Sequence, residues 1–320
     1  MVPVARGPRR ARAEPYSRRM TLRTFCLARA RSVASVACLF ALASLLAACA
    51  TPPPALDAQQ LAAELQRRPN VLLGEVHDNR AQHAVRAEAL RLLLERGARP
   101  ALAFEQIDRD KQAALDGARA SALPVGTARV DHLIAQAGAR GWDWPLYRPY
   151  LELALQYDLP IIAANLSRAD ATRATREGVA AVFDEAARTR MALDRLPEAL
   201  FDGQAEAVNR GHCDLLSPDA ARRLARAQLA RDAALAEAIR PHLAPAGRGV
   251  ILFTGNGHAR NDIGVPVFLT PEERVHTWTI GIIEDAFVRN ASTLTTRFDA
   301  RFVSPTQERP DPCEQLRRKK

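Results

Sequence analysis

Five short runs of apolar residues recur along the chain, and four of them end in a polar residue or in glycine. They cover residues 71–75, 101–105, 159–165, 249–255 and 275–283. Runs of this length, bounded by turn-forming residues, are typical of strands that are buried on both faces of a sheet. The pattern therefore predicts five strands.

Helical spacing of apolar residues separates these runs. Residues 80–96 carry their apolar side chains on one face, so a helix is expected there. A longer helical stretch covers residues 169–243, with interruptions at Pro197 and Gly211. Strands that alternate with helices indicate an α/β fold with a mostly parallel central sheet and helices on both faces. The longer stretch is then a helical insertion between the third and fourth strands.

The N-terminal part differs from the rest of the chain. Residues 1–31 are rich in arginine, and residues 33–46 are uncharged and mostly apolar. A basic segment, a short apolar segment and a small-residue cleavage point are typical of an export signal. The apolar segment is shorter than the roughly 20 residues that a bilayer-spanning helix needs. Leu46-Ala47-Ala48-Cys49 resembles the motif at which bacterial lipoproteins are cleaved and acylated.

These features divide the chain into four expected parts. They are a signal peptide over residues 1–48, a lipidated Cys49 with a flexible tether over 49–59, an α/β domain over 60–300 and a loose tail over 301–320. Lipoproteins retained at the inner membrane typically have Asp after the cysteine, whereas this chain has Ala50. We therefore expect attachment to the bacterial outer membrane, with the domain facing the periplasm or the outer surface.

The formal net charge of +9 lies almost entirely in the leader, because residues 1–48 contribute +8 of it. No broad basic surface remains for a phosphate backbone, so nucleic-acid binding is not expected. Two cysteines, Cys213 and Cys313, lie beyond the lipid site. They can pair in an oxidising compartment, but the sequence does not establish whether they are close enough.

Chemically capable residues fall at the ends of the predicted strands. The set is Glu75, His77, Glu105, Asn165, Asn256 and His258. Ligands of open α/β sheets bind outside the carboxyl ends of the strands, so we expect these side chains to converge. Any one of them can also be an ordinary strand-end or turn residue. Together, they could bind a divalent metal through Glu75, His77 and His258. Alternatively, Glu75, His77, Glu105 and His258 could act as general acids and bases.

Four aromatic residues lie within residues 142–150, although aromatic residues make up only 5% of the chain. Such a cluster can form a flat apolar surface for a ligand. It can equally anchor a segment in the core. The sequence leaves both interpretations open.

Several motifs occur in an order that resembles a known family. They are Gly74-Glu75-Val76-His77, Phe104-Glu105, Trp144-Pro145-Leu146-Tyr147, Asn165-Leu166-Ser167-Arg168, Gly211-His212-Cys213, Gln228 with Arg231-Asp232, and Gly255-Asn256-Gly257-His258. This series is similar to that of the ChaN family, haem-binding lipoproteins linked to bacterial iron uptake, over about residues 60–285. The family looks related to a wider group that includes erythromycin-esterase-like and Tiki/TraB-like proteins.

The resemblance implies a haem site, a homodimer around haem and cooperation with an outer-membrane haem receptor. Ligation in the family is through tyrosine, which makes Tyr147 and Tyr150 the expected iron ligands. Other residues expected to contact haem are Trp144, Arg148, Asn165, His212 and Asn256.

The sequence is therefore compatible with two functions. The first is an exported lipoprotein that binds haem. The second is a metal-dependent hydrolase that uses the glutamates and histidines at the strand ends. The family likeness favours haem, whereas the collection of ionisable groups favours hydrolysis.

Overall fold

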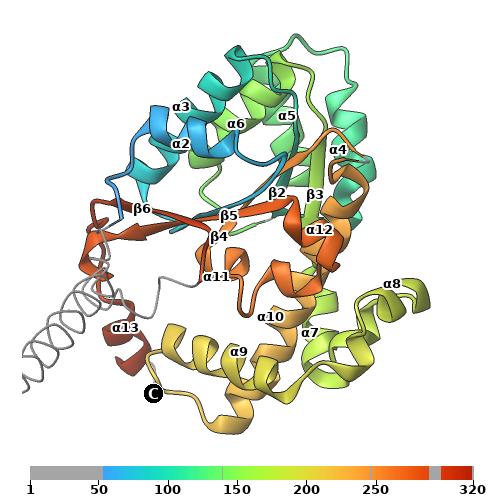
Figure 1. Cartoon of the computed structure of the whole chain (residues 1–320), viewed down its shortest axis with the longest axis vertical. Coiled ribbons are helices and arrows are strands. Elements are labelled where there is room, and N and C mark those ends of the chain that lie inside the picture. Colours follow the sequence, from blue (N-terminus) through green and yellow to red (C-terminus); the bar gives the residue numbers. More distant parts are fainter. Residues whose placement is uncertain (1–52, 139, 246, 288–296, 319–320) are drawn as a thin grey trace, which may run out of the picture. The chain divides into compact units, whose positions relative to one another are not determined.

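A six-stranded sheet runs through the centre of the structure (Figure 1), which is a computed structural model describing residues 53–138, 140–245, 247–287 and 297–318. The strands are β1 (Asn70–Glu75), β2 (Ala101–Asp108), β3 (Ile161–Asn165), β4 (Val250–Gly255), β5 (Thr277–Glu284) and β6 (Ala300–Ser304). Their order is β3-β2-β4-β1-β5-β6, and every pairing is parallel. The predicted α/β class and its five strands are confirmed, and β6 is an additional strand.

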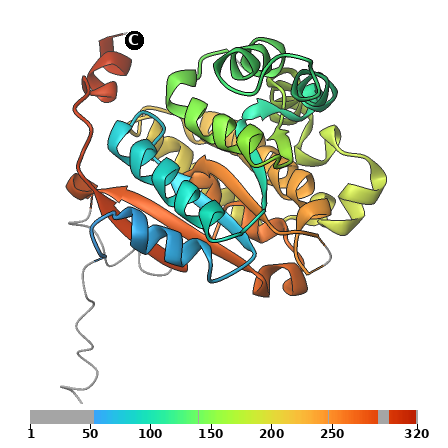
Figure 2. The same ribbon diagram turned by 90° about the horizontal axis from the view of Figure 1, so that it is seen from above.

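Two layers of helices cover the sheet, as Figures 1 and 2 show. One layer consists of α2 (Ala58–Leu65), α3 (Arg80–Glu95), α4 (Gln112–Arg119), α5 (Thr127–Ala137) and α6 (Trp144–Gln156). The other consists of α7 (Arg168–Glu177), α8 (Glu185–Arg190), α9 (Glu198–Gly211) and α10 (Pro218–Ile239). Alternate strand residues point to opposite faces, so Val71 and Leu73 pack with the first layer and Leu72 with the second.

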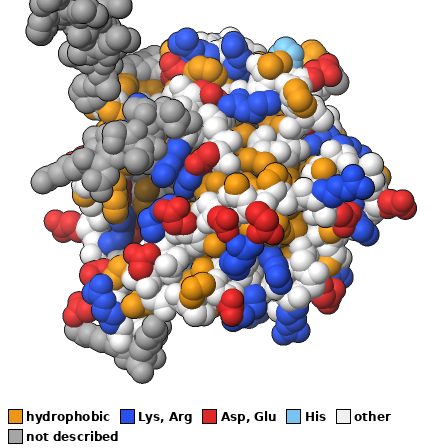
Figure 3. All heavy atoms as spheres, turned by 60° about the horizontal axis from the view of Figure 1, so that its bottom comes forward, with side chains coloured by type: hydrophobic (Ala, Val, Ile, Leu, Met, Phe, Trp, Pro, Cys, Tyr) orange, Lys and Arg blue, Asp and Glu red, His pale blue; other side chains and the backbone are white. Residues whose placement is uncertain are grey.

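The helical insertion predicted between the third and fourth strands is the second layer. Pro197 precedes α9, and Gly211 is its last residue, so both expected interruptions mark helix ends. Ser217 caps α10 by accepting a hydrogen bond from the backbone of Ala220, with Pro218 in the first turn. Figure 3 shows the face at the bottom of Figure 1, where apolar side chains gather among acidic and basic ones.

Two expected boundaries are wrong. The loose tail expected from residue 301 instead begins with β6, which pairs with β5 along its whole length. A short helix, α13 (Pro312–Arg318), lies near the C-terminus. The expected tether over residues 49–59 also ends early, because Ala55 bridges to Val303 and α2 begins at Ala58. The contact of Ala55 with Val303 joins distant parts of the chain, and β6 is short and includes Arg301, so no local pattern marks either segment.

Covalent and membrane features complete the fold. Cys213 and Cys313 form a disulfide, with their Cα atoms 5.5 Å apart. The signal peptide and Cys49 lie outside the described residues. Among the helices that the structure describes, none is both long and apolar enough to cross a membrane.

Candidate ligand-binding and acid–base site

Three neighbouring strands bring the strand-end residues together. Glu75 ends β1, Glu105 lies in β2, and His258 lies in α11 (Asn256–Ala259), the short helix that follows β4. Oε1 of Glu105 lies 3.5 Å from Nε2 of His258 and 4.0 Å from Nε2 of His77. A buried carboxylate therefore sits between two imidazoles at the carboxyl edge of the sheet, where α/β folds bind ligands.

Glu75 is fully surrounded by protein groups. Its carboxylate pairs with Arg86 of α3, which is itself fully buried. Oε1 also accepts a hydrogen bond from the Tyr147 hydroxyl at 2.5 Å and lies 2.8 Å from Nδ1 of His77. The cation, the phenol and the imidazole together balance the buried charge.

The metal site expected at Glu75, His77 and His258 is not formed. The carboxylate of Glu75 is engaged by Arg86, Tyr147 and His77. Within the described ranges, no group of three or more His, Cys, Asp or Glu side chains is placed to hold a metal ion. The sequence placed the three residues at one edge correctly, but it could not show that an arginine already neutralises the carboxylate.

His77 is arranged as a neutral base. Its Nδ1 lies against Glu75, which can only accept, so Nδ1 carries the proton and Nε2 keeps a lone pair. Burial lowers the pKa of His77, and nearby His258 lowers it further, although Glu105 opposes both effects. The side chain is still 45% exposed. A Cβ at Gly255 would lie 2.9 Å from this ring, so glycine lets the ring rest against the end of β4.

His258 is arranged as an acid. Its Nδ1 lies 2.6 Å from Oδ1 of Asp232, which comes from α10 and also accepts a hydrogen bond from Gln204. Burial alone would lower the pKa of His258, but Glu105 and Asp232 outweigh it and raise the pKa to about 9.

The two carboxylates that hold His258 respond differently to burial. For Asp232, burial is the larger effect and raises the pKa to about 6 despite the imidazole. For Glu105, burial also acts to raise the pKa, but the net effect is a lowered pKa. The lowering comes from the charges of His258 and His77 and from hydrogen bonds donated by Thr254 and Gly255. Around neutral pH, protonated His258 therefore lies between two ionised carboxylates.

The two predicted asparagines have structural partners. Nδ2 of Asn165 donates to the backbone oxygen of Glu105, and its Oδ1 accepts from Arg231. Asn256 makes two hydrogen bonds with the backbone of Ile282, where β5 no longer pairs with β1. Asn165 thus supports the end of β2, while Asn256 holds β5 and also lines the cavity described next.

A groove in two adjoining parts, here called the rim groove, opens beside these residues. The first part has a volume of about 440 Å³ and includes His77, His212, His258 and Ile263 in its lining. The second has a volume of about 340 Å³ and includes Arg210, Ile283, Phe287, Arg297 and Phe298. The two parts share Val76, Ala207, Asn256, Gly257 and Arg260. Each volume is in the range of small-molecule sites.

His212, like His77, is a residue of this groove that is prepared to bind a metal centre, and it lies outside the acid–base cluster. Its Nδ1 lies 2.8 Å from the backbone oxygen of Val208, one turn earlier in α9. A carbonyl can only accept, so Nδ1 carries the proton and Nε2 is the nitrogen left for coordination. A backbone carbonyl on the distal nitrogen is the usual way in which proteins orient a ligating histidine.

The aromatic segment does not form a ligand surface, which was one of the two interpretations that the sequence left open. Tyr147 and Tyr150 are 1% and 0% exposed, and their hydroxyls bond to Glu75 and to His83. Burial raises the pKa of both tyrosines, which disfavours a phenolate. Neither tyrosine fits as an iron ligand in this arrangement. The segment belongs to α6, whose apolar side faces the core, so the core-anchoring interpretation is the correct one.

Trp144 and Arg148, the other two residues of this segment that were expected to contact haem, also do not line the rim groove. Trp144 packs edge-on against Tyr147 and against the core of the first helical layer. Arg148 pairs with Asp131 of α5. In contrast, Trp142, which was not singled out, lies edge-on to His77 with ring centroids 4.9 Å apart.

One residue that holds the site, Arg86, was missed from the sequence. Arg86 lies on the buried face of α3, next to Gln82 and His83. Three polar residues on the inward side of a helix were a signal that a buried partner exists. Asp232, which belongs to one of the motifs of the family resemblance, lies among alanines and leucines in α10, but its contact with His258 was not predicted.

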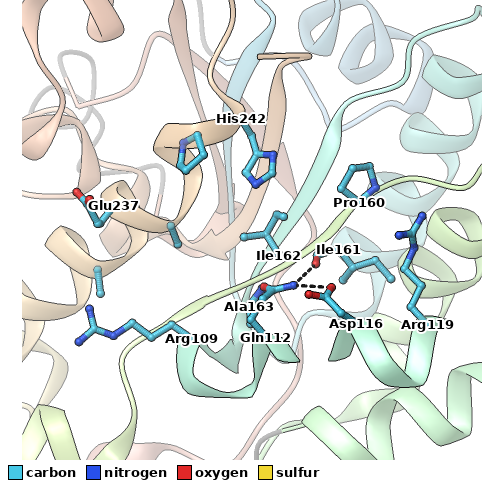
Figure 4. Close-up of a pocket in the computed structure, with 13 residues that line it drawn as sticks. Arg109, Gln112, Asp116, Arg119, Pro160, Ile161, Ile162, Ala163, Glu237 and His242 are labelled. Atoms are coloured by element: carbon cyan, nitrogen blue, oxygen red, sulfur yellow. Dashed lines mark hydrogen bonds between the residues drawn. The ribbon is translucent and has the colours of Figure 1, made fainter. Parts of the chain in front are cut away.

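A separate cavity of about 500 Å³ lies beside the first half of the edge strand β3 (Figure 4). The side-chain amide of Gln112 bonds to the backbone of both Ile161 and Ala163 there, so it occupies the free edge of the sheet. Arg109 and Arg119 in its lining pair with Asp170 and Asp158. This cavity is remote from the strand ends, and its charges are already balanced.

Comparisons with solved structures place the fold. A chain described as "Cofacial heme binding to ChaN of Campylobacter jejuni" is 17% identical, with a TM-score of 0.53, over 70% of this chain and 85% of that chain. A mutant of the erythromycin esterase EreC in its open conformation is 13% identical, with a TM-score of 0.40, over 71% and 72% of the two chains. At these identities the first likeness shows the fold alone.

Sequence comparison is more specific. Curated protein sequences give no significant match. A family model described as "Haem-binding uptake, Tiki superfamily, ChaN" matches residues 61–269, which include every side chain of the acid–base cluster and His212. The chain therefore belongs to this ChaN family of the Tiki superfamily.

Proposed function

We propose that this protein binds haem in the rim groove, with His212 as the iron ligand. The observation that carries the proposal is the orientation of His212, whose Nδ1 is fixed by the carbonyl of Val208 while Nε2 remains for coordination. Family membership supports haem as the ligand, and the burial of Tyr147 and Tyr150 argues for a different ligand from the one the family resemblance implied.

The rest of the groove suits the other parts of haem. Phe287 is 60% exposed and, with Ile283 and Phe298, offers an apolar wall for the porphyrin. Arg210 and Arg297 line the same part and can pair with propionates in addition to their acidic neighbours Glu206 and Asp262. Bound haem would supply an iron centre whose axial ligand comes from the protein.

A hemin titration followed by Soret absorbance tests this proposal. We expect saturable binding by the purified protein and an affinity lowered by about tenfold or more in His212→Ala, because an axial ligand is lost. His132→Ala is the matched control, since His132 lies on α5, outside both parts of the groove. Equal binding by the two variants would exclude His212 as the ligand.

We propose further that the protein is a lipoprotein of the bacterial outer membrane that serves haem or iron uptake. The lipoprotein-like sequence ending at Cys49 supports this, and a disulfide is in keeping with an oxidising compartment. Partners would be an outer-membrane haem receptor and, around the ligand, a second copy of the chain. Replacing Cys49 by Ser should abolish the incorporation of labelled palmitate, because the thiol that would be acylated is lost; labelling that persists would exclude Cys49 as the lipid site.

A second function, hydrolysis by acid–base catalysis, is favoured by the opposite states of the two histidines. Neutral His77 presents a lone pair and protonated His258 presents a proton, both within 4.0 Å of Glu105. Such a pair can activate water and protonate a leaving group. Turnover of p-nitrophenyl acetate should fall by about a hundredfold in His77→Ala and stay unchanged in His132→Ala. Equal rates in the two variants would remove this candidate.

A further inference from the structure

The C-terminal arm (residues 305–318) is bound to the loop that follows β1. Its Arg309 donates hydrogen bonds to both oxygens of Asp78 and to both oxygens of Glu284. Glu284 ends β5, and its side chain is completely buried. Asn79 donates to the backbone oxygen of Pro305 and to Glu284. The arm is therefore part of the folded structure beside the strand ends.

The far end of the arm is fixed to the rim groove. Cys313 in α13 forms the disulfide with Cys213, 100 residues earlier in the chain. Cys213 follows His212, which comes directly after the end of α9. Figure 1 shows α13 beside this part of the molecule. The covalent bond thus joins the arm to the residue next to the proposed iron ligand.

The turn that carries His212 has an unfavourable backbone. Cys213 and Asp214 have φ values of 61° and 56°, in the left-handed region that non-glycine residues seldom adopt. Surrounding contacts must hold such residues in place. Asn209 supplies several of these contacts through its backbone oxygen and its side chain, which bonds to Asp214 and Leu216. The disulfide is the remaining covalent restraint on the turn.

We propose that the Cys213–Cys313 disulfide positions His212 in the rim groove, so that its redox state sets the affinity for haem. Without the bond, the turn would relax toward more favourable backbone angles, and the contact of His212 with Val208 would loosen. Reduction by a dithiol transfers two electrons and two protons, breaks the S–S bond and leaves two cysteine thiols and an oxidised dithiol. This inference rests on the haem site proposed above.

A set of variants tests whether the disulfide acts through His212. We expect Cys213→Ala/Cys313→Ala to weaken hemin binding by about tenfold, as for other groups that orient a ligating histidine. Both cysteines are replaced because a single free thiol could itself bind iron. Adding this pair to His212→Ala should weaken binding no further, since both changes remove the same interaction. Additive losses, or wild-type binding by the double cysteine variant, would overturn the inference.

A second measurement does not depend on haem. Amide hydrogen exchange in residues 209–216 should accelerate in the double cysteine variant and stay at the wild-type rate in Glu308→Gln. Glu308 is an exposed residue of the same arm, and replacing it leaves both cysteines in place. If the wild-type protein binds no hemin but exchange accelerates, the haem proposal fails while the positioning role of the disulfide stands. Unchanged exchange in the double cysteine variant would refute that role.

Discussion

A single buried carboxylate, that of Glu75, organises the candidate site. Its side chain is inaccessible to solvent, so its charge has to be balanced within the protein. Arg86 supplies the cation, and Tyr147 and His77 supply hydrogen bonds. This carboxylate fixes the tautomer of His77. The base that the exposed imidazole offers therefore depends on the buried ion pair of Glu75 and Arg86.

Replacing Arg86 tests this dependence. Arg86→Met should lower the free energy of unfolding by about 3–5 kcal/mol, because Glu75 would remain buried without a cation. The double variant Arg86→Met/Glu75→Gln should lose less, since no uncompensated charge would remain. Urea denaturation measures both values. Equal losses in the two variants would mean that the cost arises from packing around Arg86 and not from charge.

His258 gives stability a defined pH dependence. Its pKa is about 9 in the folded protein against 6.5 for a free histidine, so the folded state binds the proton more tightly. The resulting stability is complete below pH 6.5 and is lost as pH rises through 9. The shift corresponds to about 3 kcal/mol. Asp232, with a pKa of about 6, is already ionised over most of this interval.

Urea denaturation at pH 6.5 and pH 9 measures this loss. Wild-type protein should become less stable over the interval, and His258→Gln should show a smaller change. A change of the same size in both proteins would assign the pH dependence to other groups.

Some of these residues could be predicted from the sequence, and others could not. Glu75, Glu105 and His258 were found because each lies at or just after the end of an apolar run, and parallel strands bring such ends to one edge. Arg86 and Asp232 lie in the middle of helices, where periodicity alone does not say which buried carboxylate or imidazole they meet. Tyr147 and Tyr150 were assigned to haem by family resemblance, but the inward face of α6 buries both.

At the level of elements, the C-terminal arm and β6 extend the fold beyond the expected domain. Strand β6 was missed because Ala300–Ser304 is short and includes Arg301, so no apolar run marks it. Its place next to β5 also depends on a contact between distant segments, which local patterns do not encode. The arm then brings Arg309 to Glu284, a carboxylate with no exposed surface.

Arg309→Gln should therefore weaken the attachment of the arm. Glu284 would keep hydrogen bonds from Asn79 and from the backbone of Gln307 but lose its cation, at a cost of about 2 kcal/mol or more. Limited proteolysis should then cleave the arm faster than in Glu308→Gln, which removes an exposed charge from the same segment. Equal cleavage rates would show that the disulfide and the other contacts retain the arm without Arg309.

At the scale of the whole molecule, the carboxyl edge of the sheet carries residues for both proposed functions, haem binding and hydrolysis, and these residues come from different elements. The acid–base cluster is built on β1, β2 and the segment after β4, with Asp232 of α10 behind it. The proposed iron ligand lies just after α9, in the helical insertion. The alternation of strands and helices predicted the strand ends and the insertion, but not that His77, His258 and His212 line one groove.

His77 and His258 line the same part of the rim groove as His212, so two variants test whether the two proposed functions depend on different side chains. Glu105→Gln removes the charge between the histidines and so lowers the pKa of His258, which should abolish ester hydrolysis. Glu105 does not line the rim groove, so hemin affinity should stay at the wild-type value. His212→Ala should do the reverse, because His212 makes no contact with Glu105 in the structure. If either variant impaired both activities, haem binding and hydrolysis would depend on the same side chains, and assigning haem to the insertion and hydrolysis to the strand ends would be wrong.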